Sequence, residues 1–247
     1  MYNVWFSTIS SVLIVSLVSL VGLVVFFMKV GYKSHYLKYL ISLACGVLLG
    51  DVFIHLIPEM AEQGFSYNLG IWMLLGILIY FILERLILMH HSHTEHDEQA
   101  HSVAWLSLWG DAVHNFLDGM LIAVSYSVSF EVGVATTIAV ILHEIPHEIG
   151  DFAILLHGGW TVKRAAIANF VTALTAIAGG IVGLTIVGFV EKSEQVLLPL
   201  GAASFIYIGM SDLIPQLHKE KNWPSLVIQG IMATVGAVAM YLLLFLE

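Results

Sequence analysis

Long apolar runs, separated by short polar breaks, fill almost the whole chain of 247 residues. A helix of about 20 predominantly apolar residues crosses the hydrocarbon core of a bilayer, so each such run is a candidate transmembrane helix. We predict eight of them, over residues 3–28, 36–59, 68–90, 103–128, 130–157, 161–190, 196–217 and 224–246. The predicted fold class is therefore all-α, a polytopic membrane protein with eight transmembrane helices.

The charge content agrees with this prediction. Only 11% of the residues are charged, whereas a soluble domain carries roughly 25%. With 59% hydrophobic residues, the chain is also too apolar to be intrinsically disordered. The connections are short except for residues 90–101. We therefore expect a single transmembrane domain over 1–247, in contact with the lipid bilayer and without a nucleic-acid partner; a homodimer is compatible with the sequence.

The basic residues are unevenly distributed over the connections. The odd-numbered connections and the helix ends beside them hold Lys29, Lys33, Lys38, Arg85, Lys163, Arg164, Lys219 and Lys221. The even-numbered connections hold only Lys192. Cytoplasmic loops carry the excess of Lys and Arg. This predicts that both termini lie outside the cell, in a plasma membrane or a bacterial cytoplasmic membrane.

Two short segments resemble each other across the chain. Residues 55–59 read His-Leu-Ile-Pro-Glu, and residues 212–216 read Asp-Leu-Ile-Pro-Gln. Five spans separate them, so they would cross the membrane in opposite directions, as inverted repeats of transporters do. This suggests an inverted repeat of spans one to three and six to eight around a central pair, spans four and five.

Ionisable residues are numerous inside the predicted spans. Each costs at least ~2.5 kcal/mol on insertion scales and therefore marks a pathway or a site. They are Asp51, His55, Glu59, Asp111, His114, Asp118, His143, Glu144, His147, Glu148, Asp151 and Asp212, with Asn115 among them. No Lys or Arg lies beside them to compensate the carboxylates. A bound cation would supply that charge, and imidazole with carboxylate suits zinc first, then Fe²⁺ or Mn²⁺. A proton relay is the alternative.

The spacing of these residues favours a metal site between spans four and five. His114 and Asp118 are i, i+4, as are His143 and His147, so the two pairs offer four ligands for tetrahedral zinc. Asn115 with Asp111, and Glu144 with Glu148, form a second set one residue further on, so two adjacent metal positions are possible. Pro146 is expected to open its helix locally. We assign Asp51, His55, Asp111, Asp151 and Asp212 to the pathway.

The two motifs on these spans resemble the paired signature of the ZIP family of metal transporters. They read His-Asn-Phe-Leu-Asp-Gly at 114–119 and His-Glu-Ile-Pro-His-Glu at 143–148, the second in the form of the His-rich subfamily. The resemblance extends over essentially the whole chain. It implies import of zinc, with Fe²⁺, Mn²⁺ or Cd²⁺ as further cargo, through a binuclear site at mid-membrane, and it requires no catalytic cofactor.

Individual roles follow from the same resemblance. His114, Asp118, His143 and His147 resemble the primary site, and Asn115 and Glu144 the second, with Asp118 and His147 able to bridge. Asp51 and His55 resemble the segment through which metal arrives. Many members place a carboxylate on span six, whereas this chain offers only Asn169, Thr172 and Thr175 there. The loop histidines either capture metal or are incidental; they are His90, His91, His93, His96 and His101.

Residues 143–147 are also a literal H-E-x-x-H, the zinc motif of metalloproteases. Intramembrane metalloproteases add a Leu-Asp-Gly motif, which residues 117–119 supply. That motif normally follows H-E-x-x-H, whereas here it precedes it, and Pro146 interrupts the helical turn. We therefore predict a transporter rather than an enzyme, and keep the zinc metalloprotease as the alternative.

Overall fold

The structure, a computed structural model, describes residues 3–27, 37–62, 67–89, 96–190, 192–218 and 220–246. Within these ranges every regular element is a helix and none is a strand, as predicted. The first half contains α1 (Val4–Val18), α2 (Val21–Phe27), α3 (Leu37–Asp51), η1 (Val52–Leu56), α4 (Ile57–Glu62), α5 (Tyr67–Met89) and α6 (His96–Val128). The second half contains α7 (Phe130–His157), α8 (Val162–Ala173), α9 (Thr175–Phe189), α10 (Glu194–Tyr207), η2 (Ile208–Leu213), α11 (Ile214–Leu217), α12 (Trp223–Leu243) and η3 (Leu244–Leu246).

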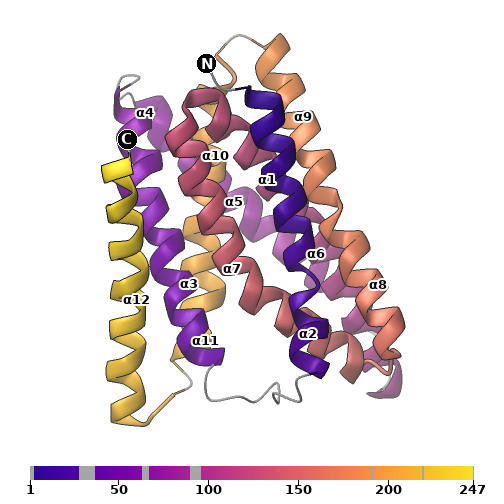
Figure 1. Cartoon of the computed structure of the whole chain (residues 1–247). Coiled ribbons are helices and arrows are strands. Elements are labelled where there is room, and N and C mark those ends of the chain that lie inside the picture. The colour runs from indigo at the N-terminus through magenta and orange to yellow at the C-terminus, as the bar shows by residue number, and fades with distance from the viewer. Residues whose placement is uncertain are drawn as a thin grey trace.

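Six helical stretches of the described chain are long and apolar enough to cross a membrane. They are Val4–Val24, Leu37–Glu62, Asn68–Arg85, Val162–Phe189, Glu194–Leu217 and Trp223–Leu243. The long helices α6 and α7 are not among them, because their acidic and histidine side chains lower their mean hydropathy. In Figure 1, α12 and α3 lie on one side of the bundle, α8 and α9 on the other, and α7 between them.

Two of the helical stretches contain a wide π-helical turn directly before a proline. In η1 the Ile57 N–H bonds to the Val52 carbonyl, and in η2 the Ile214 N–H bonds to the Gly209 carbonyl, five residues back in each case. Pro58 and Pro215 follow, and a proline ring clashes with the carbonyl four residues before it. The wider turn accommodates each ring without ending the helix. By contrast, α7 continues through Pro146, so the local opening expected there does not occur.

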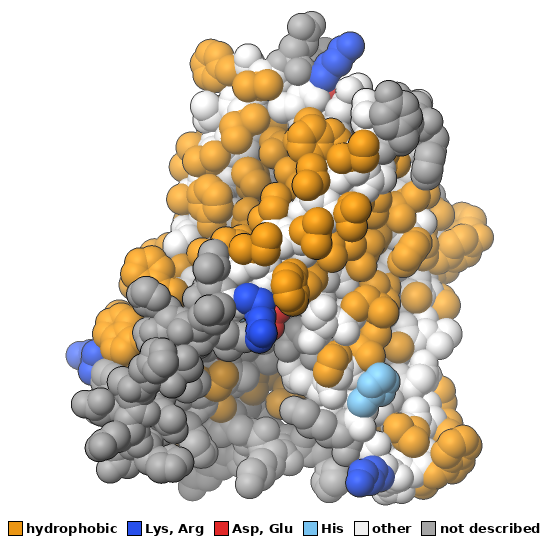
Figure 2. Space-filling view, turned by 180° about the vertical axis from the view of Figure 1, so that it is seen from behind, with side chains coloured by type: hydrophobic (Ala, Val, Ile, Leu, Met, Phe, Trp, Pro, Cys, Tyr) orange, Lys and Arg blue, Asp and Glu red, His pale blue; other side chains and the backbone are white. Residues whose placement is uncertain are grey.

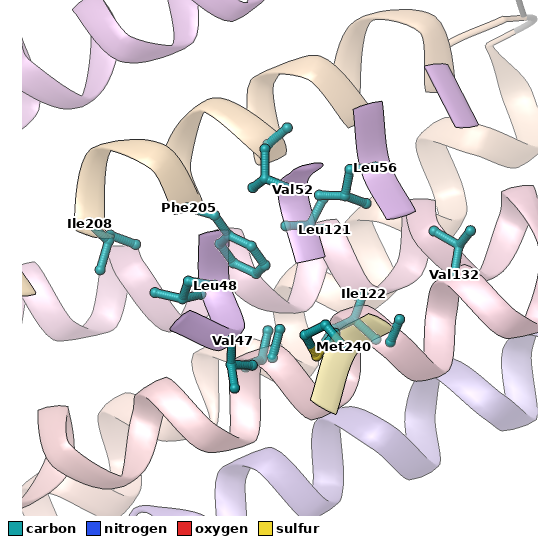
Figure 3. Packing of buried hydrophobic residues seen from close by; sticks show 14 of the residues in the cluster. Val47, Leu48, Val52, Leu56, Leu121, Ile122, Val132, Phe205, Ile208 and Met240 are labelled. Atoms are coloured by element: carbon teal, nitrogen blue, oxygen red, sulfur yellow. The ribbon is translucent and has the colours of Figure 1, made fainter. Parts of the chain in front are cut away.

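The apolar core lies where helices from both halves of the chain meet. Figure 3 shows Val47 and Leu48 of α3 with Leu121 and Ile122 of α6, close to Phe205 of α10. Large apolar side chains also cover the outside, including Phe189, which is 88% exposed. Figure 2 shows hydrophobic side chains over much of one face, with Lys and Arg at only a few separate positions. Monomeric soluble proteins rarely expose such extended apolar surface, so this exterior suits lipid.

Helix backbones approach closely at glycines. A Cβ on Gly119 of α6 would lie 1.9 Å from the Ala176 carbonyl oxygen of α9, and one on Gly179 of α9 would lie 1.8 Å from that of Phe116. Small residues let transmembrane helices approach in this way. The contact places the polar residues of α8 and the start of α9 directly against α6.

A second close pairing joins α3 to α12. A Cβ on Gly46 of α3 would lie 1.9 Å from the Ala233 carbonyl oxygen of α12. Lys38, at the start of α3, forms an ion pair with Glu220 in the connection between α11 and α12. The same ammonium donates a hydrogen bond to Ser225 Oγ at 2.9 Å. These contacts fasten one end of α3 to the beginning of α12.

Candidate metal centre

The helices α6 and α7 form an antiparallel hairpin joined by a single residue, Ser129. Its side chain accepts a hydrogen bond from the Val132 N–H and caps α7. Because the helices run in opposite directions, residues late in α6 face residues early in α7. Asp118 accordingly lies by His143, Asp111 by His147, and Ser107 by Asp151. The chemistry-bearing residues thus form one continuous polar seam inside the bundle.

Four donor atoms of this seam converge on one point. They belong to His114, Asp118, His143 and Glu144, which we call the four-donor group. The two histidine Nε2 atoms are 3.1 Å apart. Asp118 Oδ2 lies 3.5 Å from His114 Nε2 and 3.1 Å from His143 Nε2. Glu144 Oε1 lies 3.0 Å from the first nitrogen and 3.3 Å from the second.

These separations match a tetrahedral zinc site. Zinc binds imidazole nitrogen and carboxylate oxygen at about 2.0–2.2 Å, which puts neighbouring ligands of a tetrahedron about 3.3–3.5 Å apart. His143 Nδ1 lies 3.0 Å from the Ala139 carbonyl oxygen. A proton on Nδ1, donated to that carbonyl, leaves the Nε2 lone pair directed at the other donors, the arrangement found behind metal-binding histidines. The four donors are therefore preorganised for a transition metal.

A second group lies about one helical turn further along. We call Asp111, His147 and Asp151 the His147 group. His147 Nδ1 is 2.9 Å from Asp151 Oδ2 and 4.0 Å from Asp111 Oδ1. The His147 ring stacks on that of His114, with centroids 4.9 Å apart, so the two groups adjoin. The His147 side chain is 24% exposed, which makes it the most accessible ligand candidate of the seam.

The third cluster consists of carboxylates, Asp111, Glu144 and Glu148. Polar groups from α8 hold two of them: the Asn169 amide donates to Glu148 Oε2, and the Thr172 hydroxyl donates to Asp111 Oδ2. Asn115 donates to Asp111 Oδ1 at 2.7 Å. Asp111 also belongs to the His147 group and Glu144 to the four-donor group, so a second cation near the first would share ligands with it.

Several carboxylate oxygens of the seam have no hydrogen-bond donor. They include both oxygens of Asp118, Oε1 of Glu144 and Oε1 of Glu148. All three side chains are buried. Among the described residues, no Lys or Arg forms an ion pair with any of them. Buried carboxylates without donors or counter-charge are costly, and a bound cation removes that cost.

The structure divides the predicted ligands differently from the spacing argument. Glu144, expected in the second set, meets His114, Asp118 and His143, while His147 turns toward Asp111 and Asp151. Asp111 was expected both in the second ligand set and on the pathway, and Asp151 on the pathway alone. Ser107, whose hydroxyl donates to Asp151, was not predicted from the sequence. Ser107 lies four residues before Asp111, so helical spacing was the signal that could have found it.

Asp51 and His55 form a separate pair. Asp51 Oδ1 lies 3.5 Å from His55 Nδ1, and Thr136 of α7 donates to Asp51 Oδ2 at 3.3 Å. Thr136 precedes His143 by seven residues, so the pair lies roughly 10 Å from the four-donor group along α7. Both Asp51 and His55 are buried, and neither His55 nitrogen has a hydrogen-bond partner.

The other predicted residues lie wholly or partly outside the described part of the chain. His90, His91 and His93 lie outside the described residues. The backbones of His96 and His101 belong to α6 and that of Asp212 to η2, but their side chains lie outside the described part.

Comparison with known proteins identifies the family. The family model described as ZIP Zinc transporter matches residues 2–103 and 88–244. The chain belongs to the ZIP zinc transporter family. The zinc transporter ZIP13 of Pongo abelii is 36% identical over 230 residues, which cover 84% of this chain and 66% of that protein. The ZIP13 homolog of Drosophila melanogaster is 31% identical over 86% of this chain and 79% of its own length.

Other relatives are much longer than this ZIP chain. The zinc transporter ZIP4 of Mus musculus is 29% identical over 89% of this chain, but the match covers only 44% of ZIP4. The chain therefore spans less than half of ZIP4 and about two thirds of the Pongo abelii ZIP13. All of these relatives are named zinc transporters, and the metalloprotease alternative is not supported. The match to this family agrees with the six helical stretches of the described chain that are long and apolar enough to cross a membrane.

Proposed function

We propose that this ZIP chain imports zinc toward the cytoplasm and binds it in transit at the four-donor group. The observation that carries the proposal is the convergence of two imidazole nitrogens and two carboxylate oxygens at zinc-ligand spacing inside the bundle. The names of the relatives agree with zinc as the cargo. Imidazole ligands favour transition metals over Mg²⁺ and Ca²⁺, so Fe²⁺, Mn²⁺ and Cd²⁺ are the competing ions.

We propose eight membrane crossings, with α6 and α7 as the two polar ones. Their central carboxylates are buried in the seam and against neighbouring helices rather than exposed to lipid, which makes crossing tolerable despite the charge; these are Asp111, Asp118, Glu144, Glu148 and Asp151. The beginning of α1 and the end of α12 lie toward the same end of the bundle in Figure 1, as an even number of crossings requires. The distribution of basic residues supports outward termini, in a plasma or bacterial cytoplasmic membrane.

The packing pattern supports the inverted repeat. Helix α3 packs on α12 and α5 packs on α10, so the second span of one repeat contacts the third span of the other, in both directions. The central pair follows the same pattern: α6 packs on α9 of the second repeat, and α7 packs on α1 and α2 of the first. The π turns η1 and η2 occupy corresponding positions. These relations favour a single transporter domain over residues 1–247. In a homodimer, each subunit would contribute one such domain.

The seam also suggests an order of events along α7. With outward termini, zinc meets the level of Asp51 and His55 first, then the four-donor group, and then the His147 group on the cytoplasmic side. The carboxylates that Asn169 and Thr172 hold near these groups support a second cation site beside the first. Because protons compete with metal for imidazole and carboxylate, binding weakens at acidic pH.

The test is uptake of radiolabelled zinc by proteoliposomes containing the full chain. Asp118→Ala and His143→Ala remove one acidic and one imidazole donor and are expected to abolish most saturable uptake. The matched control is His218→Ala, an exposed histidine in the connection after α11. Undiminished uptake by both donor variants would refute the site. Absence of uptake by the native chain in every orientation and pH gradient would refute the function.

A further inference from the structure

A groove of about 600 Å³ lies between α6 and α8. Its walls are aromatic and aliphatic side chains, which include Trp105, Trp109, Trp160, Ile167 and Val171. Trp109, Ile167 and Val171 are 66%, 54% and 56% exposed. The groove therefore opens sideways, toward the surface that a bilayer would cover, and apolar side chains line its middle part.

One end of the groove is strongly basic. Lys163 and Arg164 line it at the start of α8. The Arg164 guanidinium lies 3.9 Å from the ring centroid of Trp160 and 5.9 Å from that of Trp105, so the aromatic walls hold it at the mouth. Within the described part of the chain, neither cation has a carboxylate within 4.0 Å. Two positive charges therefore stand at one end of an apolar groove.

We propose that this groove is a binding site for an anionic phospholipid. The headgroup phosphate lies against Lys163 and Arg164, and an acyl chain extends along Trp109, Ile167 and Val171. Tryptophan and basic residues gather at the membrane interface, and basic pockets between transmembrane helices bind anionic headgroups on the cytoplasmic side. A zwitterionic lipid presents the same phosphate together with its own cation, which lies close to these two charges, so it binds more weakly.

The inner end of the groove reaches the metal seam. Its last lining residues are Thr172 and Thr175. The Thr172 hydroxyl donates to Asp111, and the Thr175 hydroxyl donates to the Ala112 carbonyl at 2.7 Å. A bound acyl chain thus touches the two residues that tie α8 and α9 to the acidic face of α6. From the outer surface, the lipid therefore contacts the residues that hold α6, the helix that carries Asp111 of the His147 group.

Native mass spectrometry of the full chain in zinc-free detergent tests the proposal independently of transport. The probes are a phosphatidylglycerol and a phosphatidylcholine with identical acyl chains. The variant Lys163→Gln with Arg164→Gln removes both charges. The matched control, Lys192→Gln with Lys221→Gln, removes two cations that do not line the groove. Val171→Trp fills the exposed acyl path while leaving the charges in place.

We expect the native chain to prefer phosphatidylglycerol by at least about tenfold, given ~1 kcal/mol for each basic residue near a membrane anion. The Lys163 and Arg164 variant loses this preference and the control keeps it, while Val171→Trp weakens binding of both lipids. Equal affinities for the two lipids in the native chain, or equal losses in the test and control variants, would overturn the site. Unchanged binding by Val171→Trp would overturn the acyl path.

Discussion

Substitution of Gly179 by alanine is expected to disrupt the contact between α9 and α6. The new Cβ would lie 1.8 Å from the Phe116 carbonyl oxygen, whereas ordinary contact begins at 3.4 Å. The obstacle is backbone, which cannot rotate away, so the helices must separate by about 1.6 Å, the difference of these distances. A shift of that size breaks the 2.7 Å hydrogen bond from Thr175 to the Ala112 carbonyl and loosens that from Thr172 to Asp111.

The expected cost combines two terms. Forcing an extra methyl group into a packed interface costs about 1–3 kcal/mol. Each interhelical hydrogen bond contributes about 0.6 kcal/mol in membrane proteins. Together they predict a loss of roughly 2–4 kcal/mol, and a melting temperature lower by at least about 4 °C for a chain of this length.

The single cysteine provides the assay. Cys45 is buried, so a thiol-reactive fluorophore added to the detergent-solubilised protein labels it only as the protein unfolds. The control is Gly188→Ala on the same helix, where a Cβ would meet nothing within 4 Å. Zinc affinity, measured alongside, should fall in the first variant and not in the second. A melting temperature for Gly179→Ala equal to that of Gly188→Ala would refute the proposed packing.

Further predictions concern the metal seam and one surface ion pair. Glu144→Gln should lower zinc affinity at least about tenfold, and more than Glu148→Gln, whose carboxylate Asn169 already holds; titration calorimetry giving the reverse order would contradict the four-donor group. Asn169→Ala should lower the metal-free stability by about 1–3 kcal/mol, since a buried carboxylate loses its donor, and unchanged thermal unfolding would argue against that role. Lys38 lowers the pKa of Glu220 from its ordinary 4.5 to about 2. The ion pair therefore stabilises the folded chain fully above pH 4.5, and its contribution disappears as the pH falls toward 2. The melting temperature of Glu220→Gln should thus lie below that of the native chain at pH 7 and approach it between pH 4.5 and 3; a gap independent of pH would exclude this contact.

The all-helical architecture could be predicted from the apolar runs, but the direction in which single side chains point could not. His143, Glu144 and His147 all lie on a stripe about 100° wide on one helix, and the spacing does not decide which of two adjacent residues faces a given partner. Packing against α6 makes that choice. The hydrogen bond from Thr136 to Asp51 joins residues 85 positions apart, and local sequence carries no signal for it. The break between α8 and α9 at Leu174 likewise could not be predicted, because no proline or glycine stands at that position or directly beside it.

The single-residue turn at Ser129 limits how a metal ion can leave. A connection this short allows no slippage of α6 along α7, and a slip of one turn would pair Asp118 with the wrong residues of α7. Ligands on the two helices therefore keep their axial register at every stage of the proposed transport. Release must come from proton or water competition for the ligands, from side-chain rotation, or from movement of the hairpin as one body past its neighbours. If the hairpin moves as one body, mutations on its outer surfaces, where it passes its neighbours, would impair the proposed transport most.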